Sequence, residues 1–498
     1  MNVNPITRLD YPDPDVIRVE DTYYMVSTTM HFMPGCEILQ SFDLVHWEHV
    51  TYVYETLDHT DAQQLKSGQN IYGQGMWAAS LRYHEGRFYI CFVANDTRKT
   101  YLYTSEKIDG PWKKQLIEGF YHDGSLLFDE DGRNYIVYGN DEIWITELNE
   151  DLTAPKKDGL HRLLVSDHKN PELGYEGSHI QKINGYYYIF LVHSLRDRWM
   201  RTEACFYSDS LEGEFTGGDV LCDDRGYCGQ GVAQGGIVDT PDGKWYAMLF
   251  QDSGAVGRIP ILLPVTWKDH FPFFGQNGHV PEEIEVHSTR PGYIYQPLVG
   301  SDDFCNGLLP RWQFNHDPDP RYYHLDALQG TYTITTREVC TELTQAVNTL
   351  TQRMSYPSCA AEVTVDASAL KEGDVAGLCA LQGCYAAVGI TKHHGKYEVL
   401  MLDKKEDGIL DMTERTVVES HQMDFRLEAD FCNMKDEARC YYRVNKGDWL
   451  PIGTVHKLYF KLDHFTGCRF GLFCYAAEET GGSACFRDFK YYDVDEIS

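Results

Sequence analysis

Basic residues are scarce in this chain. Its 498 residues include 44 Lys and Arg against 75 Asp and Glu, which gives a formal net charge of −31. A surface of that sign repels phosphate groups, so the composition argues against nucleic acid and anionic membranes as partners. It sets no limit on a neutral ligand such as a sugar.

Long apolar runs are also lacking. No stretch approaches the ~20 apolar residues of a membrane helix, and the opening Met1-Asn-Val-Asn-Pro has no basic start and no apolar run of a secretory signal. The 15 cysteines are odd in number and show no Cys-x-x-Cys spacing, which favours reduced thiols over a disulfide framework. We therefore expect a cytoplasmic protein.

Helical periodicity is weak throughout, and the first part of the chain repeats a hairpin pattern instead. In the first copy, an apolar strand with Val16 and Ile17 leads into Glu20-Asp21 and a second strand rich in aromatic and β-branched residues. This arrangement is typical of a tight β-hairpin. Repeats of this size built from strands predict a propeller, here with five blades. The five copies start at Asp15, Ser80, Ser125, Ser178 and Gly236.

The residues two positions before each copy point to a common site. In a propeller, equivalent positions at one end of the innermost strands face the same axial depression. Clustered like charges are costly unless they are used, so the repeat predicts a functional pocket with three carboxylates. Cleavage of a glycosidic bond needs such groups, one to protonate the leaving oxygen and one to activate water or attack the sugar. The positions hold Asp13, Ala78 (with Trp77 beside it), Asp123, Glu176 and Gln234.

The blade repeat ends near residue 290. A linker over residues 291–300 contains two prolines, and the strand patterns after residue 301 become irregular without turning helical. Eight or more strands over roughly 195 residues predict a β-sandwich of the jelly-roll, concanavalin-like kind. The predicted fold is therefore all-β, with a catalytic propeller over residues 1–290 and a sandwich over residues 301–498.

Three motifs carry a resemblance to a known family. Tyr-Pro-Asp13-Pro-Asp, His122-Asp123-Gly-Ser and Tyr175-Glu176-Gly-Ser-His resemble the motifs of glycoside hydrolase family 43. The second part, with Leu462-Asp-His-Phe-Thr-Gly, is similar to the sandwich appended in the β-xylosidase branch of that family. The resemblance covers the whole chain. It implies an inverting exo-enzyme that releases terminal xylose or arabinofuranose from short xylan- or arabinoxylan-derived oligosaccharides.

The resemblance also implies roles for individual residues. Asp13 corresponds to the general base, Glu176 to the general acid and Asp123 to the modulator of the acid's pKa. Inversion predicts that the base and acid carboxyls lie roughly 6.5–9.5 Å apart, with room for a water molecule. Six residues are expected to contact the sugar: Phe32 and Trp77 as hydrophobic walls, His31, Gln234 and Arg258 as polar contacts, and Phe465 as an aromatic side chain that the sandwich places in the pocket mouth.

One departure from the family concerns the propeller axis. Many members carry a histidine there that holds a calcium ion or a water cluster, whereas the sequence around Gln234 reads Val-Ala-Gln-Gly-Gly. His179 and His193 remain as candidates for a central histidine. We expect no cofactor requirement and assign no metal ligands, which leaves room for a structural calcium ion only. The exposed faces of a sandwich also make a homo-oligomer plausible.

Two other functions stay open at this point. An endo-arabinanase-type hydrolase would need an open cleft, against which the appended sandwich argues. A non-catalytic carbohydrate-binding propeller is the second alternative, although all three carboxylate motifs are present. An invertase-like enzyme is disfavoured because its Asn-Asp-Pro-Asn motif is missing.

Overall fold

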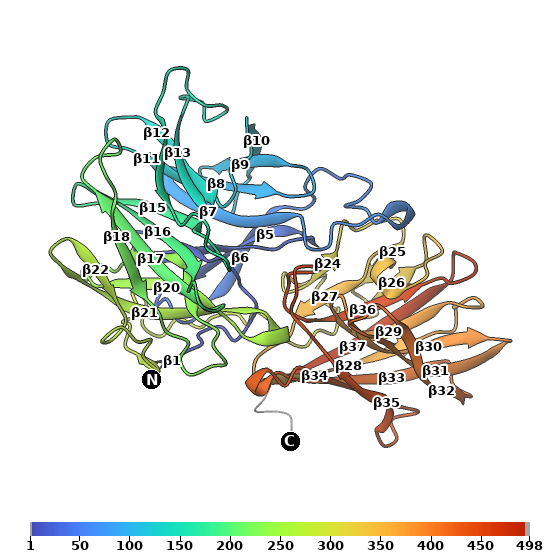
Figure 1. Ribbon diagram of the computed structural model, residues 1–498. Helices are drawn as coiled ribbons and strands as arrows, with labels where there is room; N and C mark the ends of the chain where they lie inside the picture. The colour runs from blue at the N-terminus through green and yellow to red at the C-terminus, as the bar shows by residue number, and fades with distance from the viewer. Residues whose placement is uncertain (1, 494–498) are drawn as a thin grey trace.

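Two β-domains follow one another along the chain (Figure 1). The computed structural model describes residues 2–493, so residue 1 and residues 494–498, which the predicted domain ranges include, lie outside the described residues. Five four-stranded sheets are followed by an eight-stranded and a seven-stranded sheet. The prediction of an all-β chain with a five-bladed propeller and a sandwich is confirmed. Residues 2–493 contain no α-helix, only the short 3-10 turns η1 (Lys66–Gly68), η2 (Gly254–Val256), η3 (Leu343–Gln345) and η4 (Cys432–Met434).

Each blade is one antiparallel sheet with its strands in chain order. Blade 1 consists of β2 (Asp15–Val19), β3 (Thr22–Ser27), β5 (Gly35–Ser41) and β6 (Glu48–Tyr54). Blade 2 consists of β7 (Met76–His84), β8 (Arg87–Ala94), β9 (Lys99–Ser105) and β10 (Lys113–Ile117), and blade 3 of β11 (Ser125–Phe128), β12 (Asn134–Asn140), β13 (Glu142–Leu148) and β14 (His161–Ser166). Blade 4 consists of β15 (Glu176–Ile183), β16 (Tyr186–Ser194), β17 (Arg201–Ser208) and β18 (Thr216–Leu221), and blade 5 of β19 (Val232–Asp239), β20 (Trp245–Asp252), β21 (Arg258–Lys268) and β22 (Phe271–Phe274).

The first strands of the five blades form the inner ring. Strands β2, β7, β11, β15 and β19 each contact the next strand of this series, and β19 contacts β2 again. The predicted hairpin pattern supplies these strands: in blade 1, Val19 pairs with Thr22 across the Glu20-Asp21 turn. Glu20 has a φ of 56°, the left-handed conformation that such tight turns require.

Hydrophobic clusters between neighbouring blades hold the ring together. Val26 of blade 1 packs with Leu81 of blade 2, and Val238 of blade 5 packs with Val16 of blade 1. Similar clusters fill the other three spaces between blades. Because burial of apolar surface contributes roughly 25 cal/mol per Å², each blade is stabilised mainly by its two neighbours. A short pair of strands, β1 (Asn2–Val3) and β23 (Glu283–Ile284), also joins the two ends of the propeller segment.

The second domain is a sandwich of two antiparallel sheets around one large apolar core. The eight-stranded sheet has the order β32 (Leu410–Val418), β31 (Lys396–Lys404), β30 (Ala386–His393), β29 (Val375–Leu381), β36 (Arg469–Tyr475), β27 (Leu350–Arg353), β24 (Gln313–Asn315) and β4 (Phe32–Met33). The seven-stranded sheet has the order β25 (Tyr323–Asp326), β26 (Thr331–Thr335), β37 (Ser483–Asp493), β28 (Ser358–Asp366), β33 (Gln422–Asp430), β34 (Glu437–Arg443) and β35 (Leu450–Lys457).

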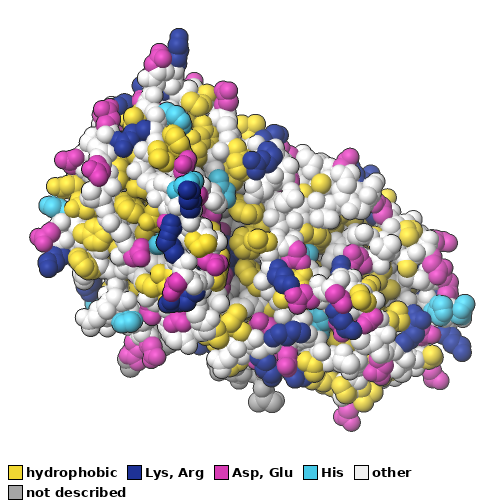
Figure 2. All heavy atoms as spheres, viewed as in Figure 1, with side chains coloured by type: hydrophobic (Ala, Val, Ile, Leu, Met, Phe, Trp, Pro, Cys, Tyr) yellow, Lys and Arg dark blue, Asp and Glu magenta, His cyan; other side chains and the backbone are white. Residues whose placement is uncertain are grey.

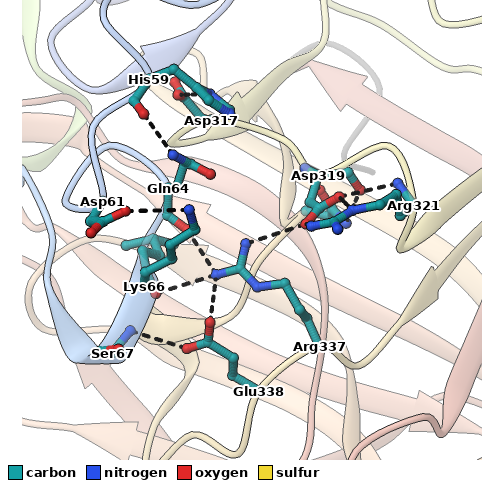
Figure 3. A network of polar contacts seen from close by, with 12 residues as sticks. His59, Asp61, Gln64, Lys66, Ser67, Asp317, Asp319, Arg321, Arg337 and Glu338 are labelled. Atoms are coloured by element: carbon teal, nitrogen blue, oxygen red, sulfur yellow. Dashed lines mark hydrogen bonds and ion pairs between the residues drawn. The ribbon is translucent and has the colours of Figure 1, made fainter.

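The two domains share structural elements. Strand β4 comes from the propeller segment, yet it extends the eight-stranded sheet by pairing with β24. The chain between β6 and β7 lies on the sandwich, as Figure 3 shows: His59 Nδ1 lies 2.7 Å from Asp317 Oδ2, and Arg337 donates a hydrogen bond to the carbonyl of Gln64 (2.9 Å). The ring of Tyr72 stacks on that of His464, with centroids 4.0 Å apart. The sandwich is therefore built into the propeller rather than tethered to it.

The surface carries both signs of charge. On the face drawn in Figure 2, basic side chains are interspersed among the acidic ones. Among residues 2–493, no helix is long and apolar enough to span a bilayer.

Candidate active site

β-Bulges shape the ends of three inner strands. The pairing of β7 with β8, of β15 with β16 and of β19 with β20 each gains one extra residue on the inner strand, close to Trp77, Gly177 and Gln234 respectively. A bulge re-aims the side chains around it. In this register Trp77 and Gly177, and not Ala78 and Glu176, occupy the positions equivalent to Gln234. Two of the five positions taken from the repeat, those in blades 2 and 4, are thus displaced by one residue.

Asp13 is held by two hydrogen-bond donors. Its Oδ1 accepts a hydrogen bond from Arg258 Nη1 (3.0 Å) and its Oδ2 accepts one from Thr28 Oγ1 (2.6 Å). The side chain is buried, and the residue has a φ of 53° between Pro12 and Pro14. Prolines on both sides restrict the backbone here, so the carboxylate has one defined orientation.

Asp123 and Glu176 meet on either side of His122. The imidazole Nε2 of His122 lies 3.5 Å from Asp123 Oδ2 and 3.5 Å from Glu176 Oε2. The backbone N–H of Gly177, in the bulge, donates to Asp123 Oδ2 (3.0 Å), and Asn140 Nδ2 donates to Glu176 Oε2 (2.7 Å). Blades 3 and 4 together therefore fix the relative positions of the two carboxyls.

The electrostatics of this cluster show that the carboxyls act on one another. Burial raises the pKa of Asp123 to about 6, and the negative charges of Glu176 and Asp13 add to the shift. Burial alone would lower the pKa of His122, but the charges of Asp123, Glu176 and Asp13 raise it to about 9. The three carboxyls predicted from the repeat thus lie within electrostatic range, with an imidazolium among them at neutral pH.

Arg258, Phe465 and Trp77 form a second part of the site. The guanidinium carbon of Arg258 lies 4.2 Å from the centroid of the Phe465 ring, and that ring lies 5.6 Å from Trp77. Trp77 also lies 5.8 Å from His122. The sandwich thereby contributes Phe465 next to the guanidinium that binds Asp13. Its role as an aromatic side chain in the pocket mouth stays a prediction.

Gln234 lies behind the acid cluster. It has a φ of 64°, and its backbone N–H donates to the buried carboxyl of Glu203 (2.7 Å). A Cβ on Gly177 would lie 2.7 Å from Gln234 Cγ, so the glutamine side chain packs directly against the bulge of blade 4. Burial raises the pKa of Glu203 well above its ordinary value, which favours the neutral form of this carboxyl.

His31 and Phe32 lie in the domain interface. The centroid of the His31 ring lies 4.3 Å from that of Phe32 and 4.8 Å from that of His316. The guanidinium carbon of Arg469 lies 3.4 Å from the centroid of the Phe32 ring. The exposed fractions of His31 and Phe32 are 0% and 1%, which leaves no surface for a ligand in this conformation. Their predicted role as sugar contacts stays a prediction.

Sequence reasoning did not assign three residues of the site. His122 was noticed only as a neighbour of Asp123, and Thr28 and Asn140 were not considered. Thr28 directly follows β3 and Asn140 ends β12, so both lie where the second strand of a blade ends. A search of that position in every copy of the repeat would have found them.

The two candidate central histidines, His179 and His193, do not offer a calcium site. His179 Nδ1 lies 3.1 Å from Asp15 Oδ1, while Asp15 Oδ2 is bound by Arg82, and His193 lies between Asp167 and Asp219. Calcium takes six to eight oxygen ligands. His122, Asp123 and Glu176 place one ligand atom each within 4.8 Å of one another, but one of the three is a nitrogen. None of these three donor sets fits calcium.

The geometry supports acid–base chemistry at one centre. A carboxylate bound by an arginine stands on one side, and a carboxyl pair that interacts with an imidazolium stands on the other. These are the groups that a hydrolase needs to donate one proton to a leaving group and to remove one from water.

Comparison with known proteins identifies the family. The model of glycosyl hydrolases family 43 matches residues 3–272, and the model of the beta xylosidase C-terminal concanavalin A-like domain matches residues 301–492. The chain belongs to glycosyl hydrolase family 43. The resemblance seen in the three carboxylate motifs is confirmed, and the protein is a glycoside hydrolase.

Several relatives of this family 43 chain match it over nearly its full length. The beta-xylosidase of Formosa agariphila is 27% identical and covers 99% of this chain and 89% of its own. The xylosidase/arabinosidase of Butyrivibrio fibrisolvens is 23% identical and covers 99% of both chains. A solved structure described as a bifunctional GH43-CE protein of Bacteroides eggerthii is 42% identical, with a TM-score of 0.93 over 100% of this chain, which spans 64% of that protein.

Proposed function

We propose that the protein is an inverting exo-glycosidase that releases terminal xylose or arabinofuranose from short xylan-derived oligosaccharides. The observation that carries this proposal is the arrangement of Asp13 on Arg258 together with Glu176 and Asp123 on His122. The names of the xylosidase and arabinosidase relatives support the choice of a pentose.

Asp13 serves as the general base in this proposal. Its two donors, Arg258 and Thr28, leave the carboxylate in a single orientation. An inverting hydrolase needs such a fixed acceptor, because the water must be aligned with the bond that breaks on the opposite face of the sugar.

Glu176 serves as the general acid. Its Oε2 is occupied by Asn140 Nδ2, so Oε1 is the oxygen that carries the proton toward the leaving group. When the proton has been given away, the imidazolium of His122 stabilises the new carboxylate. The negative charge of Asp123 disfavours the carboxylate form of Glu176 and so helps Glu176 to take up the next proton.

Trp77 and Phe465 form the walls for the terminal sugar. Aromatic rings are suited to this because they offer rigid apolar surface at little conformational cost. Since Phe465 comes from the sandwich, the second domain closes one side of the pocket, which favours removal of a single terminal residue over cleavage inside a chain.

The setting of the enzyme belongs to the same proposal. We expect hydrolysis without a cofactor, because charged side chains already balance the carboxylates. Each of the 15 cysteines is unpaired in the structure, which supports a reducing, cytoplasmic compartment. A homo-oligomer remains a prediction.

Hydrolysis of paired substrates tests the proposal. Wild type should release nitrophenol from 4-nitrophenyl β-D-xylopyranoside, α-L-arabinofuranoside or both, and xylose from xylobiose. Glu176→Ala should lower kcat for xylobiose by about 10²–10⁴-fold, the usual contribution of a general acid. The loss on the nitrophenyl substrate should be smaller, because that leaving group needs little protonation.

Glu172→Ala, which changes an exposed glutamate four residues earlier, is the matched control and should keep full activity. An equal loss on both substrate types would remove Glu176 from the role of acid. If wild type cleaves neither substrate, the terminal-pentose proposal fails, and linear arabinan would be tested next.

A further inference from the structure

Asp10 connects the two domains beside the proposed general base. Its Oδ1 accepts a hydrogen bond from the backbone N–H of Arg258 (2.8 Å), and its Oδ2 accepts one from the backbone N–H of Gly467 in the sandwich (2.8 Å). Its own carbonyl accepts a hydrogen bond from Arg353 Nε (2.9 Å). The side chain is buried, so each carboxylate oxygen serves one domain.

Two glycines allow the backbone to close on this carboxylate. A Cβ on Gly257, which has a φ of 105°, would lie 2.3 Å from Asp10 Oδ1. A Cβ on Gly467 would lie 2.7 Å from Asp10 Cβ and 2.2 Å from the carbonyl oxygen of Val256. Gly257 directly precedes Arg258, whose N–H Asp10 binds, and Gly467 itself donates the other N–H. Both segments that contact Asp10 therefore have a glycine where a side chain would clash.

Both bound segments lead directly to the site. Arg258, whose N–H is bound, holds Asp13 through Nη1. Gly467 lies two residues after Phe465, which packs under the same guanidinium and has a φ of 56°. The N–H of Cys468 also donates to the carbonyl of Ala255 (2.8 Å). One carboxylate thus fixes the positions of the Arg258 backbone and of the Phe465 loop relative to Asp13.

We propose that Asp10 is a positioning residue for the reaction: it sets the distance between the Phe465 wall and the Asp13–Arg258 pair, and so the fit of the terminal sugar. This rests on the proposed exo-glycosidase function. Asp10 touches no reacting atom and acts through Arg258 and the Phe465 loop. A displacement of about 1 Å at such a place costs on the order of 10²-fold in rate.

A double-mutant cycle tests this role. The values of kcat/KM for 4-nitrophenyl β-D-xylopyranoside and for xylobiose are measured for wild type, Asp10→Asn, Phe465→Ala and the double variant. Each single change should lower kcat/KM by about 10–100-fold. The kcat/KM of the double variant should be within about threefold of that of the less active single variant, because the effects of residues that act as a unit are not additive. Losses that multiply would overturn the proposal.

Asp436→Asn is the matched control. Asp436 is a buried sandwich carboxylate that accepts a hydrogen bond from the N–H of Ala255 across the same interface (3.1 Å), but it does not bind the Phe465 loop. Its effect should multiply with that of Phe465→Ala. If Asp436→Asn couples to Phe465 as strongly as Asp10→Asn does, Asp10 has only a general structural role.

Amide hydrogen exchange provides a readout that does not depend on activity. Asp10→Asn should accelerate exchange in the segments around Arg258 and Gly467, whereas Asp436→Asn should leave the Gly467 segment unchanged. Unchanged exchange at Gly467 in Asp10→Asn would refute the positioning role even if wild type cleaved no pentoside, which would separately refute the proposed function. If Asp10→Asn does not fold, Asp10→Thr, which keeps one acceptor oxygen, replaces it in both experiments.

Discussion

Asp123 is a buried carboxyl whose ionisation opposes folding. Burial and the charges of Glu176 and Asp13 raise its pKa from an ordinary value of 3.8 to about 6. A raised pKa of an acid means that stability is lost as pH rises from the unfolded value through the folded value. Above pH 6, the folded enzyme therefore carries an unfavourable charge that the proposed mechanism requires.

We expect Asp123→Asn to stabilise the protein while it abolishes activity. The difference in pKa corresponds to roughly 3 kcal/mol at most, and the asparagine oxygen can still accept the N–H of Gly177. Thermal unfolding at pH 7.5 should show a higher Tm, with the gain vanishing near pH 4. Asp374→Asn is the control, because burial also raises the pKa of that sandwich carboxyl to about 6. The Asp374→Asn variant should also have a higher Tm than wild type, but without loss of kcat. A lower Tm for Asp123→Asn would contradict the account.

His122 gives the opposite dependence on pH. Burial lowers its pKa, but the surrounding carboxylates raise it to about 9. The stabilisation by its positive charge is complete below the ordinary value of 6.5 and is lost as pH rises through about 9. The difference in Tm between wild type and His122→Gln should therefore shrink between pH 6.5 and pH 9.5. A difference that stays constant over this range would show that His122 is neutral in the folded enzyme.

At the scale of single residues, the sequence pointed to the acidic side chains of the site and to Arg258, but not to Thr28, Asn140 or the part played by His122. Asp13, Asp123 and Glu176 stand in motifs that repeat with the blades, so the topology brought them together. Thr28 directly follows β3 and Asn140 ends β12, the second strands of blades 1 and 3, whereas the repeat predicted the site only from the start of each first strand. His31 and Phe32 are buried against Arg469 and His316 from the sandwich, a contact across some 280 to 440 positions of sequence that no local pattern encodes.

The bulge at Gly177 is the element that places the acid. Because of the extra residue in this bulge, Glu176 lies one position earlier along the strand than the repeat predicts. The bulge also directs the N–H of Gly177 toward Asp123. Gly177 has a φ of 66°, a conformation that other residues adopt at a cost of about 1 kcal/mol. Periodicity predicts strands, but it does not show where a strand gains a residue.

We expect Gly177→Ala to lower activity more than stability accounts for. The new Cβ would lie 2.7 Å from Gln234 Cγ, so either the glutamine or the bulge must move. A shift of Glu176 should lower kcat for xylobiose by about 10–100-fold. Gly185→Ala is the control: it lies in the hairpin turn of the same blade with a φ of 86° and nothing within 4 Å of a Cβ. Equal losses in both variants would mean that backbone strain alone is responsible.

At the scale of the whole molecule, a buried ion pair joins the first blade to the sandwich. Glu37 Oε2 lies 2.8 Å from Arg353 Nη1, and both side chains are almost wholly buried. Burial alone would raise the pKa of Glu37, but Arg353 and His49 lower it to about 2. The pair thus stabilises the folded chain above pH 4.5, and this contribution is lost as pH falls toward 2.

Glu37→Gln should weaken the junction between the domains. It leaves the guanidinium of Arg353 buried without its counter-ion, which costs about 3–5 kcal/mol. Urea unfolding at pH 7 should show this loss, and the deficit should be smaller at pH 3. Glu479→Gln, which breaks the exposed pair with Lys371, should change stability by less than about 1 kcal/mol. A small effect of Glu37→Gln would show that the two domains are held mainly by apolar packing.

The two-domain architecture followed from the sequence, whereas the way the domains interlock did not. The repeat and its end near residue 290 indicated a propeller and a sandwich. The insertion of β4 into the sandwich sheet and the contact of Tyr72 with His464 depend on tertiary packing. The prediction that Phe465 contacts the sugar rested on the family resemblance; in the structure this residue packs against Arg258 and Trp77.

The configuration of the first sugar released tests the central claim most directly. Proton NMR of the anomeric signals during hydrolysis of xylobiose by wild type distinguishes the two stereochemical outcomes before mutarotation. If Asp13 activates a water molecule and Glu176 protonates the leaving oxygen, the first product should be α-xylose. Initial release of β-xylose would mean retention, and Asp13 would then act as a nucleophile rather than as the base.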